Sequence, residues 1–228
     1  MRDDICTIPV SEVFEVNDGC PICRMRDTVE KHIVDYIMGA AMMEPDVRIE
    51  TNKRGFCEHH LNQMMDCRGR LQLALMLQTH IDEINNKVLG GGILTSDAKR
   101  GEKAKTVSES CFICDKIEFG LSRMIETIYR CYENERDFRD MFNGQSAFCL
   151  PHYERLMAGA SKKNMRSKSG EFSKNLTRIT TDYSKKLYDQ LTDYCKIYDY
   201  RSKKQDADNM EAKQAVERTV AFLNGRYF

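Results

Sequence analysis

The sequence predicts an all-α protein made of two similar helical halves, and three observations carry this prediction. Apolar residues recur at helical spacing along most of the 228 residues, and no stretch shows the period-2 alternation of a strand. Both halves contain the same arrangement of cysteine and histidine residues. The chain also has only four prolines and no tryptophan, a composition that argues against a β-sandwich.

A duplicated cysteine pattern defines the two halves. Each half contains a C-x2-C pair, in GCPICR and SCFICD, and a later C-x2-H pair, in GFCEHH and AFCLPH. The C-x2-C pairs lie 91 residues apart and the C-x2-H pairs lie 92 residues apart. Because internal repeats set the architecture of a chain, we expect a first half over residues 1–90, a linker over 91–110, and a second half over 111–228 with additional C-terminal helices.

In the first half, helical periodicity runs from Met25 to Ala40, and Pro45 interrupts it. A helix of about 19 residues after Cys23 would be about 28 Å long, and the 13 residues from Glu44 to Phe56 could return about 43 Å if extended. Cys57 could therefore come back to Cys20 and Cys23. A long helix is expected next, over residues 61–88, ending at the glycines 90–92. The polar, aperiodic stretch that follows is interpreted as the linker.

The second half repeats this plan. A helix is expected over residues 117–132, followed by a charged return segment to Cys149. Pro151 favours a helix start, because proline is tolerated in a first turn. After a polar break, a long helix is expected over residues 176–198, and a last helix ends at Asn224 and Gly225.

The repeated residues have the chemistry of metal ligands. Three cysteines and one histidine in each half suit the tetrahedral coordination of zinc, and four protein ligands leave no open position. We therefore expect two structural zinc ions per chain, with each half closed by its own Cys3His site. The grouping stays open, because the C-x2-C of one half could share an ion with the C-x2-H of the other. The predicted ligands are Cys20, Cys23, Cys57, His60, Cys111, Cys114, Cys149 and His152.

Other interpretations of the cysteines are weaker. Core cysteines spaced by coincidence do not explain two matched sets of four, and dithiol redox centres do not explain the C-x2-H partners. An iron–sulfur cluster is compatible with the residue types, but the finger-like spacing favours zinc. His60 has a counterpart in the second half, whereas its neighbour His59 has none. His59 is therefore expected to be either solvated or a hydrogen-bond donor behind the ligands.

The motifs CPIC, GFCEHH, CFIC and FCLPH, with the later IYDYRSKK and AVERTVAFLNG, resemble one prokaryotic family of about this length, catalogued as a domain of unknown function. The resemblance covers nearly the whole chain. It implies a metal-binding helical protein of bacterial or archaeal type and brings no reaction with it. A Pro-Trp-Gly segment typical of that family before the last helix is missing here, so any role of that segment does not transfer.

Charge limits the classes of partner. The chain has 35 basic and 35 acidic residues, but residues 160–204 contain twelve Lys or Arg against five Asp or Glu. A basic surface with aromatic side chains can bind nucleic acid, although a solvated helix face is favoured here. The tyrosines in this region are at positions 183, 188, 194, 198 and 200.

The function that these patterns favour is a cytoplasmic, zinc-binding helical scaffold that binds a protein or a small molecule. No apolar run is long enough for a membrane helix, and no secretory signal is visible at the start. No phosphate-binding loop, dinucleotide fingerprint or nucleophile elbow is present. We expect an interaction protein rather than an enzyme. The alternatives are a nucleic-acid-binding zinc protein using residues 160–204 and a thiol-redox or metal-dependent enzyme.

Overall fold

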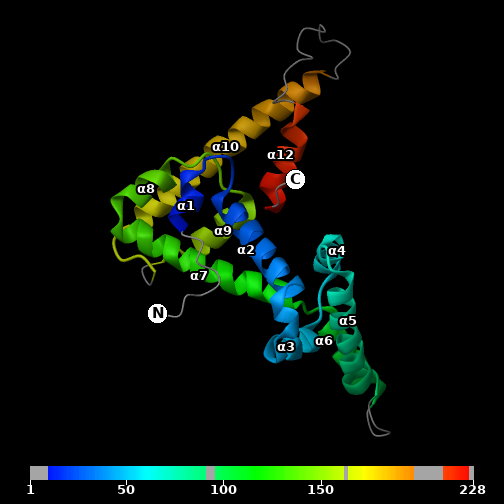
Figure 1. Cartoon of the computed structure of the whole chain (residues 1–228). Helices are drawn as coiled ribbons and strands as arrows, with labels where there is room; N and C mark the ends of the chain where they lie inside the picture. Colours follow the sequence, from blue (N-terminus) through cyan, green and yellow to red (C-terminus); the bar gives the residue numbers. More distant parts are fainter. Residues whose placement is uncertain (1–9, 91–95, 162–163, 198–212, 226–228) are drawn as a thin grey trace. The chain divides into compact units, whose positions relative to one another are not determined.

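The computed structural model describes residues 10–90, 96–161, 164–197 and 213–225. Figure 1 shows the helices in chain order. All regular structure in these ranges is helical, which confirms the predicted fold class. None of the described helices is long and apolar enough to span a membrane.

The chain folds into two compact units. The terminal unit contains residues 1–27 and 122–228, and the central unit contains residues 28–121. The chain passes from one unit to the other within two helices, α2 (Pro21–Met38) and α7 (Phe112–Asn134). Each unit therefore combines parts of both halves of the sequence repeat.

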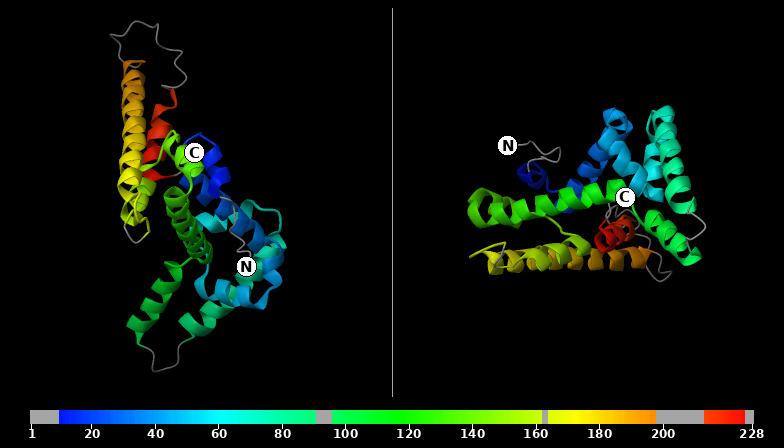
Figure 2. Two further views of the ribbon diagram at one scale, coloured as in Figure 1. Left: turned by 90° about the vertical axis from the view of Figure 1, so that its left-hand side faces the viewer. Right: turned by 90° about the horizontal axis from the view of Figure 1, so that it is seen from below.

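The terminal unit is organised by long and short helices from both ends of the chain. After α1 (Val10–Glu15) and the first turns of α2, it contains the later part of α7 and α8 (Arg136–Asn143). It continues with α9 (Leu150–Gly159), α10 (Ser169–Ile197) and α12 (Ala215–Asn224). Helix α12 packs beside α10 and α9, as Figure 2 shows for α10.

An aromatic cluster forms the core of the terminal unit. Neighbouring rings are 4.8–5.7 Å apart between centroids, at the distances that favour tilted and edge-to-face packing. The side-chain amide of Gln145 donates to the carbonyl oxygen of Phe14 at 2.7 Å and so ties α1 to this core. The rings belong to Phe14, Tyr129, Tyr132, Phe138, Phe142, Phe148 and Phe172, all buried.

The central unit is built around paired helices. After α2 come η1 (Ala40–Met43), α3 (Pro45–Arg54), α4 (Glu58–Asp66) and α5 (Arg70–Ile84). The π-helical turn η2 (Asn85–Leu89) and α6 (Asp97–Ser108) follow. The Arg48 guanidinium on α3 donates to the Leu75 carbonyl at 2.9 Å and to the Thr79 hydroxyl at 2.7 Å, which fixes α3 against α5.

The structure differs from the sequence expectations in three ways. Helices α3 and α8 occupy the two return segments, for which the sequence predicts no helix. The expected helix 61–88 is interrupted between α4 and α5 at Gly69, whose φ of 128° suits glycine alone among common residues.

The third difference is α6, which lies inside the predicted linker 91–110. This helix has no buried residue, so no apolar periodicity announces it. Local signals account for it instead, because Asp97 in the first turn and Lys105 in the last turn both complement the helix dipole.

Candidate metal centres

Each predicted ligand pair lies at the start of a helix. Cys20 and Cys23 flank the beginning of α2, and Cys111 and Cys114 flank that of α7. Cys57 and Cys149 are the residues that precede α4 and α9, with His60 and His152 in the first turns. The positive end of a helix dipole favours a thiolate, so all four pairs lie where negative charge on sulfur is stabilised.

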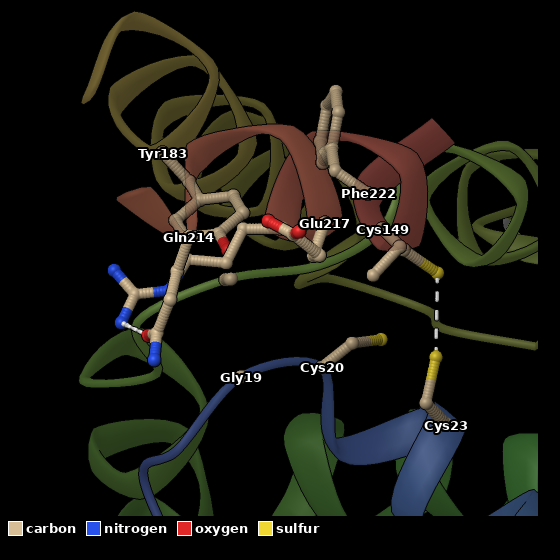
Figure 3. A pocket seen from close by; sticks show the side chains of 11 residues that line it. Gly19, Cys20, Cys23, Cys149, Tyr183, Gln214, Glu217 and Phe222 are labelled. Carbon is tan, nitrogen blue, oxygen red and sulfur yellow. Dashed lines mark hydrogen bonds between the residues drawn. The ribbon is translucent and has the colours of Figure 1, made fainter. Parts of the chain in front are cut away.

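The buried cluster consists of Cys20, Cys23, Cys149 and His152, all in the terminal unit and all buried. His152 Nδ1 is 3.6 Å from Cys20 Sγ, 3.4 Å from Cys23 Sγ and 3.1 Å from Cys149 Sγ. Figure 3 shows the sulfur atoms of Cys23 and Cys149 facing each other, 3.6 Å apart. The Cys23 thiol also donates to the carbonyl oxygen of Gly225 at 3.3 Å, so the end of α12 covers this cluster.

The half-exposed cluster consists of Cys57, His60, Cys111 and Cys114, all in the central unit. His60 Nδ1 is 3.1 Å from Cys57 Sγ, 3.3 Å from Cys111 Sγ and 3.4 Å from Cys114 Sγ. His60 and Cys111 are buried, whereas Cys57 is partly exposed and Cys114 is exposed.

Hydrogen bonds and an ion pair hold the C-x2-C pair and the C-x2-H pair of the half-exposed cluster together. The Phe112 amide donates to the Gly55 carbonyl at 3.0 Å, and the Ser110 hydroxyl donates to the Arg54 carbonyl at 2.5 Å. Arg54 also forms an ion pair with Asp115. These contacts join the end of α3 to the start of α7, and they bring the loop containing Cys57 next to Cys111.

Both clusters fit a single tetrahedral ion. Bonds of about 2.3 Å to sulfur and 2.0 Å to nitrogen place tetrahedral ligand atoms about 3.5–3.8 Å apart. The four donor atoms of each cluster all lie within 4.8 Å of one another, and the hydrogen-bonded pairs among them are 3.1–3.8 Å apart. The described part of the chain contains no disulfide. Both clusters could therefore hold a metal ion.

The grouping of these residues is crossed between the halves. The C-x2-C of the first half meets the C-x2-H of the second, and the reverse holds for the other cluster. The expectation that each half closes its own site is therefore wrong, and the crossed grouping of the pairs, which the sequence left open, is confirmed. The physical reason lies in α3, since ten helical residues span about 15 Å where ten extended residues span about 33 Å. These ten residues thus have less than half the return reach that an extended chain would give.

Within the buried cluster, one thiol is acidic and the others are not. Burial would raise the pKa of Cys20, but hydrogen bonds from Cys149, Cys23 and His152 lower it well below its usual value. The same hydrogen bonds act oppositely on the partners. The hydrogen bonds with Cys149 and Cys20 raise the pKa of Cys23, and the bond with Cys20 raises the pKa of Cys149 to about 12. The metal-free cluster therefore concentrates its negative charge on Cys20.

In the half-exposed cluster, too, one thiol has a lowered pKa and another has a raised pKa. Burial opposes ionisation of Cys111, but the hydrogen bond with His60 prevails and lowers the pKa of Cys111 to about 6. Burial and the hydrogen bond to Cys111 raise the pKa of Cys114 to about 12. Burial would lower the pKa of His60, whereas Cys111 and Glu30 outweigh it and raise this pKa to about 10.

A carboxylate lies directly behind the half-exposed cluster. Oε1 of Glu30, on α2, is 2.9 Å from His60 Nε2 and 2.8 Å from His59 Nε2. His59 is therefore not simply solvated, although 45% of its side chain is exposed. Sequence reasoning missed Glu30. Its one signal is an acidic residue beside the apolar positions Val29 and Ile33 on the same helix.

A cavity of about 490 Å³ opens beside the buried cluster. Figure 3 shows the rings of Tyr183 and Phe222 and the carboxylate of Glu217 on one side, with the cysteine sulfur atoms on the other. Arg218 also lines the cavity and donates to the Gln214 side chain at 3.0 Å. This volume lies within the range of small-molecule sites. No motif in the sequence indicated it.

The basic region expected at residues 160–204 is described only in part, because residues 162–163 and 198–204 lie outside the described ranges. Tyr183 packs against Phe222, with ring centroids 5.9 Å apart, and so contributes to the cavity. Tyr188 is 72% exposed. Nucleic-acid binding by this region stays a prediction.

The described helices and the two Cys3His-type clusters define an all-helical protein with two candidate metal centres. The chain belongs to the family of unknown function DUF6062, whose model matches residues 1–228. This match confirms the resemblance to a family of unknown function. Searches among curated proteins and among solved structures gave no match.

Proposed function

We propose that the protein is a zinc-binding helical scaffold, with one structural zinc ion in each Cys3His cluster. The observation that carries this proposal is the convergence of four ligand pairs, two C-x2-C and two C-x2-H, into two groups whose donor atoms lie within 4.8 Å of one another. Thiolate and imidazole donors select zinc over magnesium or calcium, which prefer oxygen.

A structural role follows from the number of donors. Three thiolates and one imidazole complete a four-coordinate zinc ion, so no position stays free for water or substrate. Each ion would also join helices that are distant in sequence, α2 to α9 in one unit and α4 to α7 in the other. Binding of structural zinc contributes on the order of 10 kcal/mol at neutral pH, enough to decide whether these helices stay together.

The scaffold role is supported by the cavity next to the buried cluster. Its aromatic walls, Tyr183 and Phe222, and its charged residues, Glu217 and Arg218, suit a small molecule with an apolar body and polar ends. In this proposal zinc holds α2 and α9 as the floor of the cavity, and α10 and α12 supply its walls.

Metal analysis of protein purified without added metal tests the proposal. We expect two zinc ions per chain by elemental analysis and by native mass spectrometry. The Cys195→Ser variant is the matched control, because Cys195 is an exposed cysteine outside both clusters, and it should retain two ions. Fewer than two ions in the wild type, or iron in place of zinc, would contradict the proposal.

A further inference from the structure

Glu30 is a buried acidic residue whose position requires an explanation. Its exposure is 6%, and burying a carboxylate is costly unless it is hydrogen-bonded. Its Oε1 accepts from His60 Nε2 at 2.9 Å and from His59 Nε2 at 2.8 Å. These contacts place the carboxylate on the side of the His60 ring opposite to the cluster.

The geometry of His60 shows what this contact achieves. Its Nδ1 lies 3.1–3.4 Å from the sulfur atoms of Cys57, Cys111 and Cys114. A neutral imidazole that gives the Nδ1 lone pair to a metal has its proton on Nε2. The Glu30 carboxylate accepts that proton's hydrogen bond, and so it selects both the tautomer and the orientation that metal binding needs.

The sequence repeat shows that this arrangement belongs to one half only. The residue 91 positions after Glu30 is Leu121, which is buried and apolar. A helix at this place therefore packs with either residue, and a carboxylate is not a requirement of the fold. The leucine also identifies a substitution that suits the site in size and burial.

We infer that Glu30 is a positioning residue for the half-exposed cluster, holding His60 as an Nδ1 zinc ligand from behind. The inference rests on the proposed zinc function and deepens it. His59, with 45% of its side chain exposed, bonds to the same oxygen and holds the carboxylate from the solvent side. Loss of a hydrogen-bond partner behind a ligand typically reduces metal affinity 10- to 100-fold.

The test is competition for zinc between a chelator and the full-length protein. The chelator removes zinc from each cluster in a separate step. The step that is absent in Cys114→Ser is assigned to the half-exposed cluster. We expect Glu30→Leu to weaken this step by about 10- to 100-fold and to leave the buried cluster unchanged. Glu30→Gln, which keeps an acceptor oxygen, should restore part of the affinity.

Testing Glu30→Leu again in the His60→Cys protein distinguishes a role of Glu30 in positioning His60 from a role in packing. In His60→Cys the cluster has four thiolates and no imidazole to orient, so Glu30→Leu should then have no effect on zinc affinity. An equal loss in both backgrounds, or unchanged affinity in Glu30→Leu alone, would overturn the inference. A wild-type protein that binds no zinc would instead refute the proposed function, so the two failures are distinguishable.

Discussion

The buried cluster and the half-exposed cluster contain the same residue types in different surroundings. All four residues of the first are buried, and Gly225 at the end of α12 contacts Cys23. In the second, Cys114 is exposed and Glu30 lies behind the histidine. The comparison teaches that one donor set can occupy two environments. The buried set is shielded from solvent within its unit, whereas Cys114 of the half-exposed set is accessible to solutes.

The largest expected effect is on stability. Cys23→Ser should lower the free energy of unfolding by on the order of 4 kcal/mol or more, because it removes a ligand from the buried cluster. Cys114→Ser should cost less, about 2 kcal/mol, because solvent already reaches that site. Chemical denaturation followed by circular dichroism measures both values.

Cys195→Ser is again the control, with an expected change within about 0.5 kcal/mol. Equal losses in Cys23→Ser and Cys114→Ser would show that burial does not distinguish the clusters in stability.

The second effect is the dependence of zinc affinity on pH. The raised pKa values of Cys23 and Cys149 in one cluster, and of His60 and Cys114 in the other, mean that these groups carry protons at pH 7. Zinc must displace at least two protons per site, so affinity falls as pH falls, by about 100-fold or more per pH unit.

The pH dependence of zinc affinity should differ between the two clusters at low pH and at high pH. Below about pH 6 Cys111 also becomes protonated, and above about pH 10 His60 no longer carries a proton to displace. Compared with the buried cluster, the half-exposed cluster should therefore show a zinc affinity that changes more steeply with pH in acid and less steeply in alkali. Chelator competition across pH measures both slopes, and an affinity independent of pH would contradict the assignment of protons.

The third effect is on the rate at which thiols react. In zinc-loaded protein, Cys114 should be alkylated at least about tenfold faster than the cysteines of the buried cluster. This ratio corresponds to a difference of about 1.4 kcal/mol in the activation free energy of alkylation. Accessibility and thiolate character together set this rate. Peptide mass spectrometry after timed alkylation ranks the cysteines, and preferential labelling of Cys20 or Cys23 would reverse the comparison.

The fourth effect concerns Gly225. Its φ is 68°, and an added Cβ would lie 3.3 Å from Cys149 Sγ and 3.4 Å from Pro151. Gly225→Ala should cost about 1–2 kcal/mol and weaken zinc binding in the buried cluster only. The matched control is Gly101→Ala in α6, where the added Cβ meets nothing within 4 Å. This control should stabilise α6 by about 0.5–1 kcal/mol, as thermal denaturation would show.

The helical class and the eight cluster residues could be predicted because their signals are local. Helical periodicity is readable within α2, α7 and α10 alone, and each ligand pair is a motif of four residues. The repeat also distinguished His60 from His59, and the structure places His60, not His59, among the sulfur atoms.

The grouping of the clusters could not be predicted because it depends on distant packing. It follows from the helical state of α3 and from the contacts of Gly55 and Arg54 with the start of α7, and no short motif encodes these. The role of Glu30 could not be predicted from the sequence for a related reason. A single acidic residue on an amphipathic helix has no distinctive spacing, and its partner lies 30 residues away.

The crossed grouping also determines when each cluster can be completed during synthesis. The half-exposed cluster needs residues 57–114, a stretch that lies entirely inside the 20–152 stretch of the buried cluster. A chain growing from its N-terminus therefore holds all four ligands of the inner stretch while Cys20 and Cys23 still await Cys149 and His152. In the proposed zinc-bound protein, the central segment would therefore take up its ion first on the ribosome, and the ion that joins Cys20 and Cys23 to Cys149 and His152 would follow.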